Sequence, residues 1–208
     1  MSELRADTRV CILDYGSGNV KSVANLLGYL KVEYEVSNCE AAIERASHLV
    51  LPGVGAFGAA MNRIRQTIPL ATMSSAVRTQ HKPFLGICVG MQVLAERGEE
   101  FGTHQGLGWI PGTVRRFRDC GVPVPHIGWN DVRRCGTGSL LGEHESMDFY
   151  FVHSYLFEAG DAASVQATTT YGETFASIIQ RENIVGVQFH PEKSQKAGML
   201  LLRNFLRQ

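Results

Sequence analysis

The stretch Lys82–Glu96, KPFLGICVGMQVLAE, joins an apolar run directly to a periodic segment, with Cys88 between them. Residues 84–87 predict a buried strand, and the residues after the cysteine predict a helix. Gly86 and Gly90 flank the cysteine at two residues on either side, which is the spacing of G-x-S-x-G nucleophile elbows with sulfur in place of oxygen. Glycine is needed where a tight turn brings backbone segments too close for a Cβ atom. The stretch therefore predicts a strand, a tight turn and a helix.

Cys88, at the tip of that turn, is a candidate nucleophile. Its thiol is expected to be exposed and its backbone strained. The helix, continued by Val93 and Leu94, would place the thiol at a helix N-terminus, where free N–H groups and the macrodipole favour a thiolate. A free cysteine is more often a buried core residue. The two flanking glycines favour the nucleophile over that alternative.

The composition indicates a chain that acts on a small molecule. With 208 residues it is long enough for one α/β domain, residues 1–208, and short for two. Its 20 basic and 20 acidic residues balance, which argues against nucleic acid as a partner, and no apolar run reaches the roughly 18 residues of a membrane helix. The five cysteines form no C-x-x-C pair, and the histidines show no zinc-ligand spacing. We expect free thiols, no metal and a reducing, cytoplasmic compartment.

Alternating strand and helix patterns predict an α/β fold. After residue 98, glycines interrupt short β-rich runs, which favours hairpins over further parallel strands. We therefore expect a mostly parallel open sheet flanked by helices, with a smaller antiparallel region. The predicted strands besides 84–87 are residues 10–13, 33–36, 48–51, 149–155, 164–170, 174–180 and 184–189, and the predicted helices besides the one after Cys88 are residues 20–30, 41–46, 56–66, 70–78 and 196–206.

The loop after the third predicted strand, Pro52-Gly53-Val54-Gly55, exposes consecutive backbone N–H groups. Such groups stabilise a developing oxyanion if they face a nucleophile. A simple turn is the alternative, and it would be preferred if the loop stood alone. Because the elbow ends the next strand of the predicted sheet, the oxyanion interpretation is favoured.

A second group of chemically active residues follows the last predicted strand. His190 and Glu192 are separated by one proline, so the carboxylate can fold back on the imidazole, fix its tautomer and support the imidazolium. Cys88, His190 and Glu192 would then form a triad. The alternative is a helix-capping glutamate beside an incidental histidine, which the presence of Cys88 disfavours. His153, at the end of an apolar strand, is more typical of a structural residue than of a catalyst.

Three motifs resemble the class I, or triad, glutamine amidotransferases along essentially the whole chain. They are residues 52–55, 86–92 and 190–192, in that order. The resemblance implies that Cys88 is the nucleophile, His190 the acid and base, and Glu192 the residue that orients His190. It also implies a class I glutamine amidotransferase-like fold, L-glutamine as substrate, and neither a cofactor nor a metal.

The same resemblance implies which groups hold the substrate and its oxyanion. Gly53 and Val54 would supply backbone groups to the oxyanion, and the N–H of Val89, just after the nucleophile, is the expected second donor. The positions that match the family's glutamine-binding residues are Gln92 and the main chain of His153, Ser154 and Tyr155.

Three further segments, residues 14–19, 125–130 and 150–155, resemble one branch of the family, in which the glutaminase is a separate subunit. Its partner there is a synthase cyclase with a (β/α)8 barrel, which receives the ammonia within a heterodimer. We expect this chain to work in the same way, with a docking face around the mouth that holds the cysteine. The residues expected on that face are Tyr15, Asn19, Trp129, Asn130 and Lys193. A packed core position is the alternative for Trp129.

Other functions stay open at this stage. A cysteine peptidase or a γ-glutamyl hydrolase would use the same triad but would need an open cleft for a larger acyl donor. The glutaminase subunit of another synthase, of the pyridoxal phosphate type, lacks the Gly-Trp-Asn and Phe-Val-His-Ser-Tyr segments. A binding subunit without activity is disfavoured because all three triad positions carry competent residues.

Overall fold

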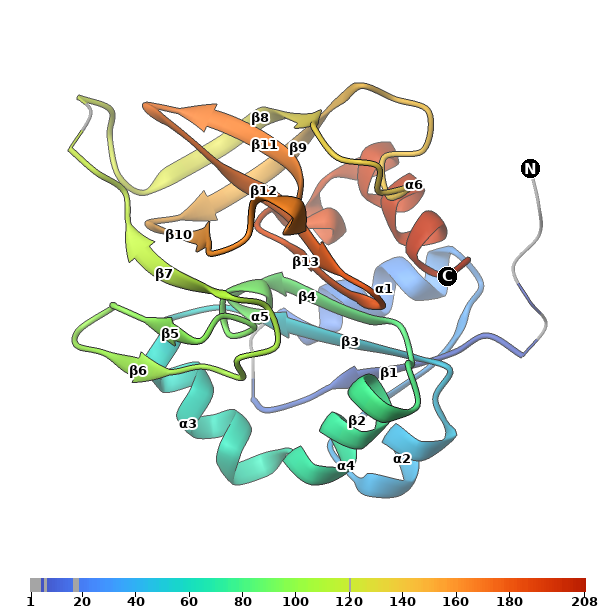
Figure 1. Ribbon diagram of the computed structural model, residues 1–208. Helices are drawn as coiled ribbons and strands as arrows, with labels where there is room; N and C mark the ends of the chain where they lie inside the picture. The colour runs from blue at the N-terminus through green and yellow to red at the C-terminus, as the bar shows by residue number, and fades with distance from the viewer. Residues whose placement is uncertain (1–4, 6, 17–18, 120) are drawn as a thin grey trace.

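The computed structural model describes residues 5, 7–16, 19–119 and 121–208. Ser17 and Gly18 of the predicted loop, and Cys120, lie outside the described residues. The described chain forms a nine-stranded sheet and a four-stranded sheet, with helices packed on the larger one (Figure 1).

The larger sheet combines a parallel half with an antiparallel half. In order across the sheet its strands are β2 (Glu33–Ser37), β1 (Arg9–Leu13), β3 (His48–Gly53), β4 (Phe84–Cys88), β13 (Ile184–Val187), β12 (Glu173–Arg181), β11 (Val165–Tyr171), β8 (His126–Arg134) and β9 (Ser146–His153). The pairs from β2 to β13 are parallel, and the pairs from β13 to β9 are antiparallel. The predicted α/β class with its parallel sheet is confirmed.

The antiparallel region is larger than predicted and is not separate. Strand β12 pairs with β13 along Ile178–Arg181, so the hairpins continue the parallel sheet through the same hydrogen-bonded edge. The second sheet has the order β10-β7-β5-β6, made of β10 (Tyr155–Ala159), β7 (Gly112–Arg116), β5 (Arg97–Gly98) and β6 (His104–Gln105). It is this smaller sheet that lies beside the carboxyl ends of the parallel strands (Figure 1).

Helices cover both faces of the parallel half. In Figure 1 α2, α3 and α4 lie on one side of the sheet, and α1 and α6 lie on the other. The helices are α1 (Val20–Tyr29), α2 (Glu40–Arg45), α3 (Phe57–Thr67), α4 (Leu70–Ser74), α5 (Val89–Gln92) and α6 (Gln195–Phe205), with a π-helical turn η1 (Ser75–Thr79) after α4 and 3-10 turns η2 (Ala162–Ser164) and η3 (Pro191–Lys193). Each long helix buries one apolar stripe, as α1 does with Val23, Ala24 and Leu27.

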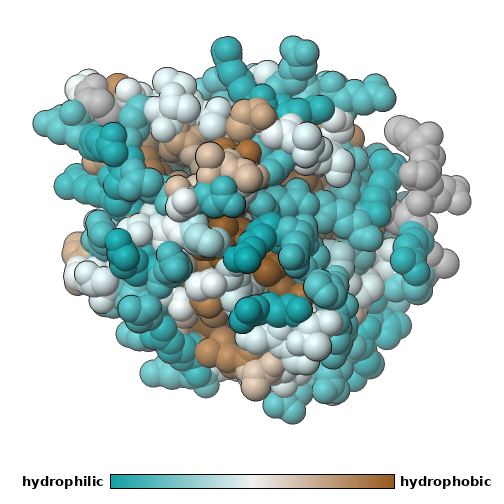
Figure 2. Space-filling view, viewed as in Figure 1, coloured by the Kyte–Doolittle hydropathy of each residue, from teal (hydrophilic) through white to brown (hydrophobic). Residues whose placement is uncertain are grey.

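The core lies between these layers. All residues of β3 and β4 are buried, because a parallel strand covered on both faces is apolar throughout instead of alternating. Strand β2, at the edge of the sheet, is mostly exposed. On the face shown in Figure 2 hydrophilic residues dominate, and hydrophobic ones show mainly in the recesses between them. Among the described residues the helices are too short or too polar to cross a bilayer.

The predicted helix after Cys88 is shorter than expected. The helix after Cys88 does not continue through Val93 and Leu94 but ends at Gln92. The reason is competition for backbone groups, since the carbonyl of Val93 accepts the N–H of Leu107 and the carbonyl of Leu94 accepts those of residues 109 and 110. These hydrogen bonds connect the residues after α5 to the segment that leads into β7 of the smaller sheet.

Candidate active site

The strand, turn and helix around Cys88 form the predicted elbow. Cys88 ends β4 and precedes α5, with φ +54° and ψ −109°, a region that side chains other than glycine rarely adopt. A Cβ atom on Gly90 would overlap the carbonyl of Leu51, and one on Gly86 would overlap the carbonyl of Gly90. The prediction that both glycines permit close backbone approach is confirmed.

The prediction that the Cys88 thiol is exposed is wrong, because its residue is only 4% accessible. The turn places the thiol on the wall of a cavity instead of on the outer surface. The side-chain amide of Gln188 donates to the sulfur over 3.7 Å, and the carbonyl of Val152 lies 4.0 Å from it. A buried thiol beside a cavity can react only with a molecule small enough to enter.

His190 and Glu192 form the predicted pair. The Nδ1 atom of His190 lies 2.7 Å from Oε1 of Glu192, and both side chains are almost fully buried. The same carboxylate oxygen accepts a hydrogen bond from the Asn19 side chain over 3.2 Å. A carboxylate held in this way fixes the histidine with Nδ1 protonated and directs Nε2 away from it.

The charge state of His190 follows from its neighbours. Burial alone would lower the pKa of His190, but the interactions with Cys88 and Glu192 and the charges on both raise that pKa to about 10. Within the described residues Nε2 has no hydrogen-bond partner of normal geometry, and Cys88 is the neighbour that contributes most to raising the pKa of His190. His190 is therefore an imidazolium at neutral pH, and an imidazolium stabilises a neighbouring thiolate.

A cavity of about 270 Å³ contains both reactive groups. This is below the roughly 300–1,000 Å³ of drug-sized sites, which suits a ligand no larger than a free amino acid. The lining residues are Val54, Gly55, Cys88, Val89, Gln92, Glu100, Pro125, Val152, His153, Ser154, Tyr155 and His190. All four residues predicted to hold glutamine are among them, as are two of the three predicted for the oxyanion. Gly53, which precedes Val54 in the sequence, is not a lining residue; it pairs with Cys88 where β3 lies beside β4.

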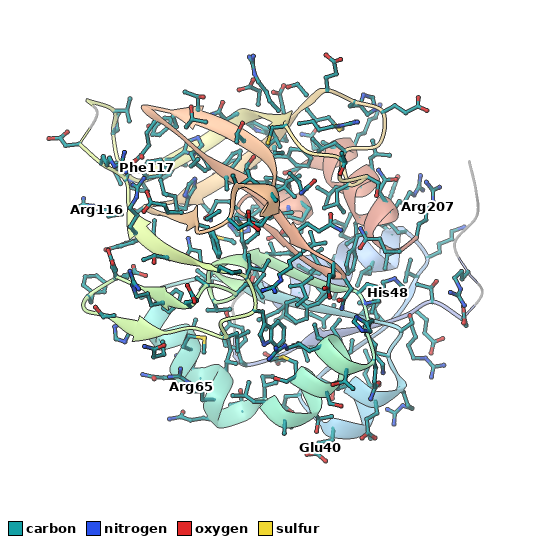
Figure 3. All side chains as sticks on the ribbon, in the orientation of Figure 1. Glu40, His48, Arg65, Arg116, Phe117 and Arg207 are labelled. Carbon is teal, nitrogen blue, oxygen red and sulfur yellow. The ribbon has the colours of Figure 1, made fainter. Side chains whose placement is uncertain are left out.

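The cavity lies at the carboxyl ends of the parallel strands. Strand β3 starts at His48 and runs toward the side of the molecule on which Phe117 is labelled (Figure 3). The ring of Phe117 lies 5.1 Å from that of His153, which lines the cavity. Sites of open α/β sheets form at this edge because the loops that follow neighbouring strands meet there.

The amide of Gln92 has a defined orientation. Its Nε2 atom donates to the carbonyl of Tyr155 over 3.0 Å and to Oε1 of Gln188 over 3.1 Å. Both amide hydrogens are thereby used, which leaves the oxygen of Gln92 as an acceptor in the cavity. That oxygen can receive a ligand ammonium group.

Two site residues escaped the sequence-based reasoning. Gln188 is fully buried and contacts both Cys88 and Gln92. Since the predicted strand of residues 184–189 runs up to His190, strand periodicity could have placed Gln188 and His190 on one side. Glu100 lines the cavity while one of its oxygens accepts the N–H of Phe57 over 2.7 Å. No local pattern marks Glu100, because it follows the short strand β5 in an irregular segment.

The predicted docking residues divide into two groups. Trp129 is 50% exposed, which excludes the core alternative, and Lys193 is exposed with its ammonium 5.6 Å from the centre of the Tyr150 ring. Asn130 is partly exposed. Tyr15 and Asn19, by contrast, are only 3% and 6% exposed, so their predicted place on the docking face is wrong for this chain.

The two buried residues fail as docking residues for a physical reason. Asn19 lies inside the molecule, where its side-chain amide donates to the Glu192 carboxylate, and Tyr15 is buried with the core. Asn19 thus belongs to the triad's surroundings. Within the described ranges no group of three or more His, Cys, Asp or Glu side chains is arranged to hold a metal ion.

Comparisons with known proteins identify the family of the chain. The family model described as glutamine amidotransferase class-I matches residues 11–208. The chain is 46% identical to imidazole glycerol phosphate synthase subunit HisH of Herpetosiphon aurantiacus, over 95% of this chain and 93% of that protein. It is 47% identical to the protein of the same name from Salinibacter ruber, over 93% of this chain and 92% of that protein.

Solved structures resemble the fold at much lower identity. PurLQS from Thermotoga maritima superimposes with a TM-score of 0.75 at 15% identity, covering 96% of this chain and 97% of that one. A glutamine amidotransferase from the same organism gives a TM-score of 0.66 at 16% identity, covering 96% of this chain and 82% of that one. At these identities the likeness concerns the fold alone.

Proposed function

This chain belongs to the class I glutamine amidotransferase family, and we propose that it is the glutaminase subunit of an imidazole glycerol phosphate synthase. The observation that carries the proposal is the meeting of Cys88, strained at the end of β4, with the paired His190 and Glu192 at one small cavity. The identity of 46–47% to synthase subunits over more than nine-tenths of the chain supports the same conclusion.

The proposed reaction converts L-glutamine and water into L-glutamate and ammonia. The thiolate of Cys88 attacks the carboxamide carbon, and the carbonyl oxygen becomes an oxyanion. His190, as an imidazolium, protonates the departing nitrogen, so that ammonia leaves and a thioester remains. Water, deprotonated by His190, then hydrolyses the thioester and restores the thiolate. Glu192 keeps the imidazole in one orientation throughout.

We place the oxyanion donors at the N–H of Val89 and at the loop of Gly53 and Val54. Val89 begins α5 directly after the nucleophile, and Val54, which follows the neighbouring strand β3, lines the cavity. Backbone N–H groups aimed at the developing oxyanion stabilise it because their positions are held by the fold.

We assign the amino acid end of the substrate to the part of the cavity lined by Gln92, Glu100 and residues 153–155. The free oxygen of Gln92 and the carboxylate of Glu100 are acceptors for its ammonium group, and the backbone of residues 153–155 borders the same space. The small volume disfavours a peptide, and with it the cysteine peptidase alternative. The identities to synthase subunits disfavour a γ-glutamyl hydrolase and a pyridoxal phosphate type glutaminase.

The ammonia would pass to a cyclase subunit with a (β/α)8 barrel, in a heterodimer. That partner uses it to form imidazole glycerol phosphate and an aminoimidazole carboxamide ribonucleotide in histidine biosynthesis. No cofactor is needed on this subunit. We further propose a single amidotransferase domain over residues 1–208 and a cytoplasmic location, which suits the unpaired Cys11, Cys39, Cys88 and Cys135.

The test is reconstitution with the cyclase. The mixed subunits should release glutamate and form imidazole glycerol phosphate in equal amounts from glutamine, and the cyclase alone should use only added ammonia. A chain that binds no cyclase, or that releases glutamate without supporting synthesis, would refute the proposal.

A further inference from the structure

Two buried histidines outside the triad form a hydrogen-bonded chain. The Asn130 side chain donates to Nε2 of His126 over 3.2 Å, and Nδ1 of His126 lies 3.0 Å from Nε2 of His153. Nδ1 of His153 lies 2.8 Å from the carbonyl oxygen of Tyr155. His126 is 2% exposed and His153 is 6% exposed. The four groups link strand β8 to the wall of the cavity.

The protons in this chain can be assigned from its ends. A carbonyl oxygen only accepts, so Nδ1 of His153 carries a hydrogen and its Nε2 is an acceptor. Nδ1 of His126 must then donate to it, which leaves Nε2 of His126 free to accept from the Asn130 amide. Both rings are thus neutral, in the Nδ1–H form. Burial agrees with this, since it lowers the pKa of His126 to about 4 and is the main cause that lowers the pKa of His153 to about 3.

The hydrogen-bonded chain ends on an atom of the candidate glutamine site. The Tyr155 carbonyl accepts from His153 and also from Nε2 of Gln92. The second hydrogen of that amide goes to Gln188, whose own amide donates to the sulfur of Cys88. Moving the Tyr155 carbonyl would therefore turn the Gln92 amide and shift its free oxygen.

The other end of the hydrogen-bonded chain lies on β8, a strand with exposed residues. His126 follows Pro125, which lines the cavity, and precedes Ile127, which is 59% exposed. The His126 ring is stacked between those of Tyr171 and Phe151, with centroids 4.1 Å and 4.8 Å away. A ring clamped in this way transmits a displacement of β8 and cannot absorb it by rotating.

We propose that His126 and His153 are positioning residues, which hold the Tyr155 carbonyl and through it the Gln92 amide, so that the glutamine site depends on the position of strand β8. The proposal rests on the proposed glutaminase function. Since β8 also carries the exposed Trp129, a partner that contacts this strand would act on glutamine binding through the same chain.

The first test reads the proton positions directly and requires no activity. Nitrogen-15 spectra of the free glutaminase chain labelled at histidine should show both rings neutral at pH 7, with Nδ1 protonated and Nε2 unprotonated. His126→Phe and His153→Phe identify the two sets of signals. An imidazolium, or an Nε2–H form of either ring, would overturn the proposal.

The second test separates hydrogen bonding from packing. His126→Phe keeps a stacked aromatic ring but removes the donor to His153, whereas His126→Asn keeps a donor near the Nδ1 position and removes the stacking. In the complex with cyclase, His126→Phe should raise KM for glutamine about tenfold, the equivalent of roughly one hydrogen bond. Its kcat should stay within about twofold, and His126→Asn should keep KM within about threefold of wild type. Equal KM values for the two variants would refute the role of the donor.

Two further variants complete the design. One disturbs the packing around His126, and the other replaces the donor at position 130 by an acceptor. Phe175→Leu disturbs the same aromatic cluster, since its ring lies 6.0 Å from that of His126, and should leave KM unchanged. Asn130→Asp places an acceptor against Nε2 of His126, so the spectrum should show a proton there and KM should rise. A rise with Phe175→Leu, or none with Asn130→Asp, would show that packing alone matters. Were the wild-type complex inactive, the proposed function would fail while the spectra still decided the proton positions.

Discussion

Cys88 has a side chain that is turned out of the sheet and is nevertheless buried, two properties that usually conflict at a single residue. Its positive φ turns the side chain out of the sheet, and the surrounding loops still bury it to 4% exposure. Burial excludes bulk water from the attack, while His190 supplies the positive charge that a buried thiolate needs. The backbone strain is sustained by the close packing of Gly86 and Gly90 around the turn.

Cys88→Ser should abolish glutamine-dependent synthesis by the complex and leave synthesis from added ammonia intact. A hydroxyl is a far poorer nucleophile than a thiolate at neutral pH, whereas added ammonia bypasses the step. Rates with glutamine and with an ammonium salt are measured on one preparation, so that the second rate reports folding and docking. A glutamine-dependent rate near that of wild type would show that Cys88 is not the nucleophile.

Glu192→Gln should be milder than His190→Ala, by roughly 10- to 100-fold in kcat. The histidine carries the proton, whereas a glutamine at position 192 can still accept from Nδ1 through its oxygen, with Asn19 as a second contact. Steady-state glutamate release by the two variants in complex with cyclase decides the order. An equal or larger loss in the Glu192 variant would contradict the assigned roles.

The pKa of His190 should fall from about 10 in Cys88→Ser, because the interaction with the sulfur is one of the causes that raise it. Histidine spectra recorded against pH measure both values. The raised folded-state pKa also means that the ion pair contributes stability that is complete below about 6.5, the unfolded value, and is lost as pH rises through about 10. A pKa that does not change on removing the thiol would indicate that Glu192 alone holds the charge.

At the scale of elements, the elbow depends on how closely α5 packs against the strand beside it. The backbone of Gly90 lies against the carbonyl of Leu51 in β3, and Gly53 at the end of that strand would place a Cβ atom 2.6 Å from the Gly90 nitrogen. The backbone at Leu51 and Gly53 of β3 thus meets the backbone at Gly90 without side chains between them. This contact brings the predicted oxyanion loop next to the nucleophile.

Gly90→Ala should lower the free energy of unfolding by about 3 kcal/mol, because a methyl group there overlaps backbone that cannot move aside. The matched control is Gly28→Ala in α1, where a Cβ atom would lie 3.8 Å from the Tyr34 ring, an ordinary contact. That control should be neutral or slightly stabilising, since alanine favours a helix. Urea unfolding of both variants is the measurement, and equal stability would argue against the tight contact.

At the scale of the whole molecule, the two halves of the large sheet have different tasks. The parallel strands β3 and β4 end at the predicted oxyanion loop and at Cys88, and the antiparallel strands β8 and β9 carry the exposed Trp129 and the buried His153, which lines the cavity. The active site and the proposed docking face therefore belong to one continuous hydrogen-bonded sheet.

Trp129→Ala should change the free energy of unfolding of the free glutaminase chain by less than about 1 kcal/mol, in contrast with the roughly 3–5 kcal/mol of a buried tryptophan. In the complex it should weaken association or raise the ratio of glutamate to synthesis product, because an exposed indole suits an interface anchor. The two measurements are the melting of the free chain and the product ratio of the complex.

Tyr34→Ala is the control for Trp129, since Tyr34 is 40% exposed on β2, at the far edge of the large sheet from β8 and β9. It should leave association and product ratio unchanged. If Trp129→Ala loses several kcal/mol of stability while coupling stays normal, the residue is structural and the docking interpretation fails.

The sequence by itself determined the parts of this protein that depend on near neighbours in the chain. The apolar run into Cys88, its two glycines and the His190-Pro191-Glu192 segment dictate local geometry, because backbone sterics and one rigid proline act over a few residues. The hydrophobic periodicity placed the helices and strands for the same reason. Trp129 was the exception, since neither its neighbours nor its size decided between core and surface.

Only the tertiary structure decided which distant groups meet. The Asn19 side chain reaches Glu192 across 173 positions, and His126 reaches His153 across 27. The tertiary structure also buries Tyr15, Asn19 and the nucleophile, places Gln188 against Cys88 and Gln92, and brings Glu100 to the substrate cavity. The physical reason is that burial and hydrogen bonding depend on the order in which strands join the sheet, and residue pattern along one strand does not specify its neighbours.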